Sequence, residues 1–355
     1  MVNRTKRPTR RQVIGLLGIS GVALAQNTTG PIIRTVLGDV PPESLSGGAT
    51  LFHEHMSLSP DFLPKFMSLL TSRPQPAAIA PQPGETYFLQ DLDLMTEELR
   101  AASKEGVACL VDGGHPDMGR SLDFLKRLSM RSGMPIVSGA GYYSEPFYPP
   151  EIATLSEDQI AQSLIREVGA SPYGALGEIG TWDEFTANER KVFRAVAKTH
   201  LATNLPIFTH TNFGKAALEQ LDTFESLGVN PRHVAIGHVG GLIDPEVRVH
   251  KEICKRGAFV GFDRQGGPGD ARQIPMVMAL IEAGYADNLL FASDFSNAAQ
   301  LKRNGGPGYA KTVTVFVPKL REAGAGEETL HRILVDNPRR FLAFVPKQKR
   351  SPKRV

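Results

Sequence analysis

The chain has 355 residues, of which 41% are hydrophobic and 22% charged, a composition typical of a folded domain with a sizeable core. The formal net charge of +3 is misleading, because residues 1–25 and 347–355 each carry five basic residues and no acidic ones. Without these ten, 30 basic residues face 37 acidic ones, and the body of the chain has a net charge of −7. An acidic body argues against nucleic-acid binding, and two cysteines are too few for a disulfide framework.

The N-terminus has the pattern of an export signal. A basic region containing Arg10 and Arg11 precedes an apolar run that ends in Ala23-Leu24-Ala25, a small-x-small cleavage site. The paired arginines resemble a twin-arginine signal, so we expect cleavage after Ala25 and delivery to the periplasm or the extracellular space. An ordinary secretory signal and an uncleaved anchor are the alternatives. The apolar run is too short for a stable transmembrane helix, so we expect no stable membrane insertion after cleavage.

The remaining chain alternates short apolar strands with helical segments. The predicted strands cover 49–52, 107–111, 136–137, 173–179, 206–209, 233–237, 259–262 and 289–292, after a lead-in strand over 32–36. Apolar strands separated by helices predict a parallel sheet buried on both faces. Eight such units predict an α/β fold with one domain, a closed (β/α)8 or TIM barrel. An open doubly wound sheet is the alternative, but it would carry a Gly-rich phosphate turn after its first strand.

Two segments differ from this alternation. Residues 56–90 contain six prolines, and we predict a large irregular loop over the site there. The last residues, 347–355, are predicted to form a basic, disordered tail. The expected organisation is therefore a signal peptide over 1–25, a barrel over 26–346 and the tail.

Side chains that can bind metal ions follow the predicted strands. His53 and His55 are two residues apart at the end of the first strand, so they point to the same face and can share one ion. In a barrel of this kind, function collects at the C-terminal ends of the strands. Reading these ends in order gives His53, His55, Glu178, His210, His238 and Asp294. Each alone has a structural explanation, but six together indicate two divalent ions joined by a bridging carboxylate.

The motifs around these residues resemble the phosphotriesterase family of the amidohydrolase superfamily. They are Thr50-Leu51-Phe52-His53-Glu54-His55, Gly177-Glu178-Ile179-Gly180-Thr181, Thr209-His210-Thr211, Gly237-His238, Gly261-Phe262-Asp263-Arg264, Ser293-Asp294, Gly305-Gly306-Pro307-Gly308-Tyr309 and Asn337-Pro338-Arg339-Arg340-Phe341-Leu342. The resemblance implies that His53, His55 and Asp294 bind one metal ion, and that His210 and His238 bind the other. It also implies that Asp294 is catalytic, orienting a bridging hydroxide and taking its proton.

The sequence departs from the family pattern at two positions. Glu178 stands where the best-known members have a carboxylated lysine that bridges the ions, as in a Glu-bridged branch of the family. The second departure follows His238, where Val239-Gly240-Gly241 replaces the aspartate found in many members. A glutamate supplies the same two oxygens, whereas the missing aspartate removes a proton relay and makes efficient phosphotriester hydrolysis less expected.

The resemblance implies a hydrolase that acts on lactones or carboxylic esters, with weak promiscuous phosphotriesterase activity. An amide hydrolase with the same site and a non-catalytic metal-binding barrel are the alternatives. The expected cofactors are two divalent ions, zinc first, with cobalt, manganese and iron also compatible with these ligands. Arg264 and Tyr143 resemble the substrate-binding residues of the lactonase-like members, although an ion pair and loop packing also explain them. A homodimer is expected from the family alone.

Overall fold

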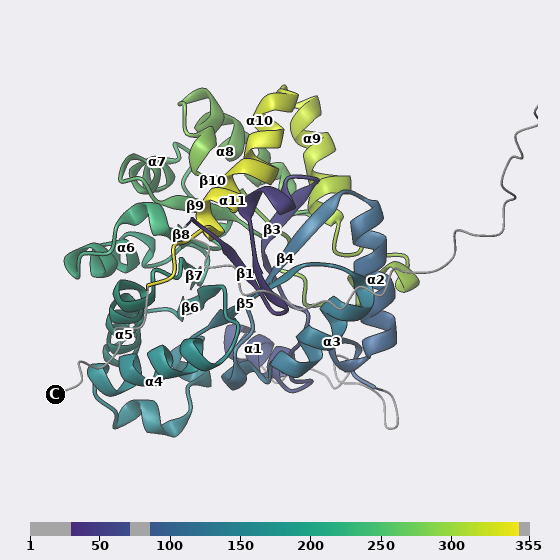
Figure 1. The fold of residues 1–355 in the computed structure, drawn as a ribbon. Coiled ribbons are helices and arrows are strands. Elements are labelled where there is room, and N and C mark those ends of the chain that lie inside the picture. The colour runs from purple at the N-terminus through teal and green to yellow at the C-terminus, as the bar shows by residue number, and fades with distance from the viewer. Residues whose placement is uncertain (1–29, 72–85, 348–355) are drawn as a thin grey trace, which may run out of the picture.

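The computed structural model describes residues 30–71 and 86–347, and an eight-stranded parallel barrel lies at its centre (Figure 1). The strands are β3 (Ala49–Glu54), β4 (Val107–Asp112), β5 (Ile136–Ala140), β6 (Ala175–Thr181), β7 (Ile207–Thr211), β8 (Val234–Ile236), β9 (Phe259–Phe262) and β10 (Leu289–Phe291). Consecutive strands are neighbours throughout. The amide of Asp294 donates a hydrogen bond to the carbonyl oxygen of His53 at 3.2 Å and joins the last strand to the first. The predicted single-domain (β/α)8 barrel is confirmed.

Helices surround the barrel on its outer side (Figure 1). They are α2 (Leu92–Lys104), α3 (Leu122–Ser132), α4 (Glu157–Ala170), α5 (Ala187–Thr203), α6 (Ala217–Ser226), α7 (Arg248–Lys255), α8 (Asp270–Glu282), α9 (Val317–Glu322), α10 (Glu327–His331) and α11 (Asn337–Leu342). A further helix, α1 (Phe62–Thr71), follows β3 at the C-terminal end of the barrel. The strands are almost entirely buried, as expected when helices cover the outer face of a parallel sheet. A capping box begins α4, where Ser156 and Gln159 bond to each other's backbone amides.

A β-hairpin covers one end of the barrel (Figure 1). Its strands are β1 (Ile33–Thr35), which the sequence predicted, and β2 (Gly38–Val40), which it did not. The amide of Val36 donates to the carbonyl oxygen of Ile136 at the start of β5, at 2.8 Å. The hairpin therefore covers the N-terminal end of the barrel, and the C-terminal end remains for the site.

The prediction of an irregular loop over 56–90 was wrong in part, because this segment contains the ten-residue helix α1. Its Pro64 lies in the first turn, where an amide has no partner within the helix and a proline is tolerated. The prolines from Pro74 to Pro83 lie outside the described residues. Near the end of the chain, Asn337-Pro338 begins α11.

The predicted signal peptide and nearly all of the predicted tail lie outside the described residues. Within the part of the chain that the structure describes, no helix combines the length and the apolar character needed to cross a bilayer. Both cysteines, Cys109 and Cys254, are buried and free.

Candidate metal centre

The structure brings together all six predicted metal ligands at the C-terminal end of the barrel. His53, Glu178 and His210 lie within strands, and His55, His238 and Asp294 lie one to three residues after the ends of β3, β8 and β10. The five residues other than Asp294 are at most 3% exposed. Their burial places four imidazoles and a carboxylate where water is largely excluded, which favours a bound cation over free solvation.

The six side chains form two groups of three. Ligand atoms of His53, His55 and Asp294 all lie within 4.8 Å of one another, and the same holds for Glu178, His210 and His238. Three protein ligands per ion, with further positions open, is the arrangement that catalytic metal sites use. The division matches the one implied by the family resemblance.

Glu178 lies between the two groups and faces both. Its Oε1 is 3.2 Å from Nε2 of His55, and its Oε2 is 2.9 Å from Nδ1 of His210. The same Oε2 lies 3.3 Å from Nε2 of His53 and 3.5 Å from Nε2 of His238. One oxygen is thus available to each group, as a bridging carboxylate requires.

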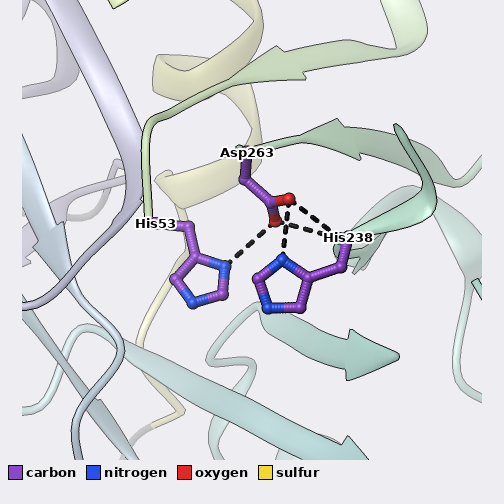
Figure 2. A group of neighbouring side chains, drawn as sticks. All are labelled: His53, His238 and Asp263. Carbon is purple, nitrogen blue, oxygen red and sulfur yellow. Dashed lines mark hydrogen bonds and ion pairs between the residues drawn. The ribbon is translucent and has the colours of Figure 1, made fainter. Parts of the chain in front are cut away.

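Asp263 orients two of the histidines, and the sequence did not reveal this role (Figure 2). Its carboxylate lies 3.1 Å from Nδ1 of His53 and 2.8 Å from Nδ1 of His238. It also accepts a hydrogen bond from the backbone amide of His238. With Nδ1–H donated to Asp263, each ring directs its Nε2 lone pair towards Glu178, which is the arrangement that outer carboxylates impose on metal-binding histidines. Although these three residues could form a third metal group, their hydrogen bonds indicate a supporting role.

The electrostatics of the cluster fit positively charged ions. Burial alone would raise the pKa of Glu178 and Asp294, but contacts with the surrounding histidines hold both carboxyls well below their ordinary values. For His55, burial lowers the pKa, but hydrogen bonds to Asp294 and Glu178 outweigh it and raise the value to about 10. His53 Nε2 is buried and makes no hydrogen bond. An ionised, acidic cluster with an unsatisfied imidazole nitrogen therefore suits divalent cations, and the residues present fit two of them.

Tyr143 and Arg264, the predicted substrate contacts, lie beside the two groups. The hydroxyl of Tyr143 is 3.1 Å from Nε2 of His210, and Nε of Arg264 donates to Oδ2 of Asp294 at 3.0 Å. Tyr143 is buried, whereas about a third of the Arg264 side chain is exposed. The sequence left an ion pair and substrate binding open for Arg264, and the structure shows the ion pair on the wall of a cavity.

This cavity has a volume of about 300 Å³, enough for a small organic ligand. It is lined by His55, Phe62, Leu63, Phe66, Met67, Tyr143, Glu178, His210, His238, Arg264, Asp294, Ser296, Asn297 and Gln300. Helix α1 supplies an apolar wall, and the segment after β10 supplies amide and hydroxyl groups on the lining. The residues of α1 were not predicted to line the site, because the many prolines of segment 56–90 indicated an irregular loop in spite of the helical spacing of Phe62 and Phe66.

Comparison with known proteins agrees with this geometry. Residues 31–342 match the phosphotriesterase family. The phosphotriesterase homology protein of Escherichia coli is 32% identical over 305 residues, which cover 83% of this chain and 97% of that protein. The N-acetyltaurine hydrolase of Homo sapiens is 28% identical and covers 88% of this chain and 98% of its own length.

Solved structures give the same result. A resiniferatoxin-binding protein from Rhodobacter sphaeroides has a TM-score of 0.76 at 29% identity, with 88% of this chain and 94% of that chain covered. A lactonase from Listeria monocytogenes has a TM-score of 0.74 at 26% identity, with 88% and 98% covered. Fold and site thus define a (β/α)8 metal-dependent hydrolase. The chain belongs to the phosphotriesterase family, and the resemblance inferred from its motifs is confirmed.

Proposed function

We propose that this protein is a binuclear metal hydrolase that cleaves lactones or other carboxylic esters. The observation that carries the proposal is the pair of three-ligand groups with Glu178 between them, open to the cavity. His53, His55 and Asp294 would hold one ion, and His210 and His238 the other. Zinc is the first expectation, and cobalt, manganese and iron also suit these ligands.

When bound, two divalent ions would lower the pKa of a coordinated water and polarise the substrate carbonyl. Proton transfer and substrate positioning are performed by residues of the protein. Asp294 lies at the edge of the cavity with Oδ1 3.3 Å from His55 and Oδ2 on Arg264. From there it accepts the proton of the attacking water and returns it to the leaving oxygen. Tyr143 borders the second group and positions the acyl carbonyl.

The proposal is tested with purified mature protein loaded with Zn²⁺. Metal analysis should find two ions per chain, and a panel of lactones and aryl esters should be hydrolysed. Glu178→Ala should lose at least one ion and all turnover. Two ions with no hydrolysis of any lactone, ester or amide would contradict a catalytic role and favour a metal-binding barrel that serves as a binding protein.

An amide hydrolase is the second candidate, and Arg264 is the observation that favours it. Its guanidinium lies on the cavity wall with Nε engaged by Asp294, so the terminal nitrogens are placed to bind an acid group of a substrate. Several relatives are named N-acetyltaurine hydrolases, after a substrate that joins an amide to a sulfonate.

Matched substrate pairs distinguish the two candidates. An N-acyl amino acid and its uncharged carboxamide differ only in the group that would meet Arg264. An amidase that uses Arg264 in this way should prefer the acid by about 10- to 100-fold in kcat/KM, the worth of a charge-assisted hydrogen bond. Slow hydrolysis of both amides beside fast hydrolysis of a lactone would leave the ester proposal in place.

A further inference from the structure

Glu54 lies between the two histidines of β3, and its side chain points the opposite way. Successive strand residues alternate between faces, so Glu54 points away from the metal centre while His53 and His55 point into it. The side chain is fully buried. Glu54 therefore lies in a buried environment outside the metal centre, and it has no role in the proposed reaction.

The Glu54 carboxylate holds the segment that carries Asp294. Its Oε1 accepts a hydrogen bond from the amide of Ser293 at 2.8 Å. Its Oε2 accepts one from the hydroxyl of Ser293 at 2.7 Å and one from the amide of Phe295 at 2.9 Å. The residues on both sides of Asp294 are thus fixed to one carboxylate.

Asp294 itself has a backbone conformation that needs such support. Its φ is +49°, in the left-handed region that non-glycine residues seldom adopt. Its own amide donates to the carbonyl oxygen of His53 at 3.2 Å. Three consecutive amides, from 293 to 295, therefore bond to residues 53 and 54. Without these bonds, the segment could relax to a negative φ and turn the Asp294 carboxylate away from His55.

We propose that Glu54 is a positioning residue, which sets the Asp294 carboxylate against His53 and His55 and so completes one of the two metal groups. The inference rests on the proposed binuclear centre. Oδ1 of Asp294 lies 3.3 Å from Nε2 of His55, so a small rotation of the backbone would separate atoms that must share one ion. The same strand that supplies two ligands thereby also fixes the third.

The test measures Zn²⁺ binding to metal-free protein in two variants and a control. Glu54→Gln keeps the shape of the side chain but replaces one of the two accepting oxygens with an NH2 group, which cannot accept a hydrogen bond from the amide that faces it. Ser293→Ala removes one of the three hydrogen bonds and leaves the carboxylate in place. Glu189→Gln is the matched control, because Glu189 is also buried and accepts from the amides of Glu145, Trp182 and Thr186, away from the ligands.

We expect Glu54→Gln to bind one of its two Zn²⁺ ions about 10- to 100-fold more weakly, the usual effect of losing a residue that orients a metal ligand. Ser293→Ala should show a smaller loss at the same ion. Glu189→Gln should lose thermal stability but bind both ions as the wild type does. The absorption spectrum of Co²⁺-loaded Glu54→Gln should report altered coordination at one site only.

Wild-type stoichiometry and affinity for both ions in Glu54→Gln and Ser293→Ala would overturn the proposal, whatever the change in Tm. If Glu54→Gln does not fold, Ser293→Ala decides alone. A wild-type protein that binds fewer than two ions would overturn the binuclear centre together with this inference. If the wild type binds two ions and both variants bind two ions with unchanged affinity, only the role of Glu54 is overturned.

Discussion

Nδ1 of His238 lies 2.8 Å from Oδ1 of Asp263, and this contact joins a predicted metal ligand on one strand end to a buried carboxylate on the next. The same carboxylate also contacts His53, at the end of β3, the first strand of the barrel. One residue therefore fixes the ring orientation of a histidine from each metal group. Burial alone would raise the pKa of Asp263, but the charge and hydrogen bonds of His238 and His53 hold it far below its ordinary value.

Asp263→Asn should weaken binding of both ions. The two imidazoles contact different oxygens of Asp263, and an asparagine replaces one of these oxygens with an NH2 group that cannot accept a hydrogen bond. We expect a loss of about 10- to 100-fold in Zn²⁺ affinity, measured by competition with a chromophoric chelator. Asp270→Asn is the control, since Asp270 is a buried carboxylate that accepts from Gly266 and Lys319 but from no histidine. Equal Zn²⁺ affinity in both variants would show that Asp263 does not support the ligands.

Removal of metal should destabilise the fold. Any ion that binds the native state and not the unfolded chain stabilises the native state by mass action. At a free Zn²⁺ concentration about 1,000 times the Kd, each ion contributes about 4 kcal/mol. Calorimetry should therefore show a lower Tm after chelation and recovery on adding Zn²⁺.

Glu178→Ala supplies the control for this measurement. Without the central carboxylate the two groups share no ligand, and the rise in Tm on adding Zn²⁺ should shrink or disappear. A wild-type Tm that chelation leaves unchanged would indicate that the cluster is stabilised by its own hydrogen bonds and binds no ion.

The sequence predicted the barrel because its strands are continuous apolar runs, and it predicted the ligands because they stand at strand ends. Helix α1 could not be predicted in this way, since the proline content of 56–90 outweighed the spacing of its apolar residues. Pro64 in fact occupies a position where the helix tolerates it.

The supporting residues were missed for a different reason. Asp263 is 210 residues from His53 in the chain, and Glu54 is 239 from Ser293, so neither partnership leaves a local signal. Asp263 follows β9 directly and stands in one of the family motifs, but its contacts with the two histidines could not be predicted from that position. The role of Glu54 depends on which strand closes the barrel, and this emerges only from the three-dimensional structure.

Export can be tested without reference to activity. The full chain should be expressed in a bacterium with a twin-arginine pathway. The exported product should then begin at Gln26. Replacing Arg10 and Arg11 with lysine keeps the charge and should retain the protein in the cytoplasm, because this pathway reads the arginine pair. Lysine at Arg4 and Arg7 is the matched control and should leave export unchanged. An exported protein that still contains Arg10 and Arg11 would exclude cleavage after Ala25.

The apolar wall of the cavity should determine which acyl groups are accepted. Phe66 lies on α1 with its ring 5.3 Å from Trp182 and 6.5 Å from His210, so it borders the second metal group. Full burial of a phenylalanine-sized group against substrate corresponds to about 1.5–3 kcal/mol. Phe66→Ala should therefore reduce kcat/KM by about 10- to 100-fold for substrates with long alkyl acyl groups, mainly through KM, and have little effect on small lactones.

Leu69→Ala is the appropriate control for Phe66→Ala, because Leu69 is on the same helix but is 39% exposed and does not line the cavity. It should leave the chain-length preference unchanged. Steady-state kinetics over a series of esters that differ only in acyl length would measure the effect. A uniform loss across the series, including the small lactones, would mean that Phe66 supports His210 through packing and does not select the substrate. A loss confined to long acyl groups would place those groups against α1.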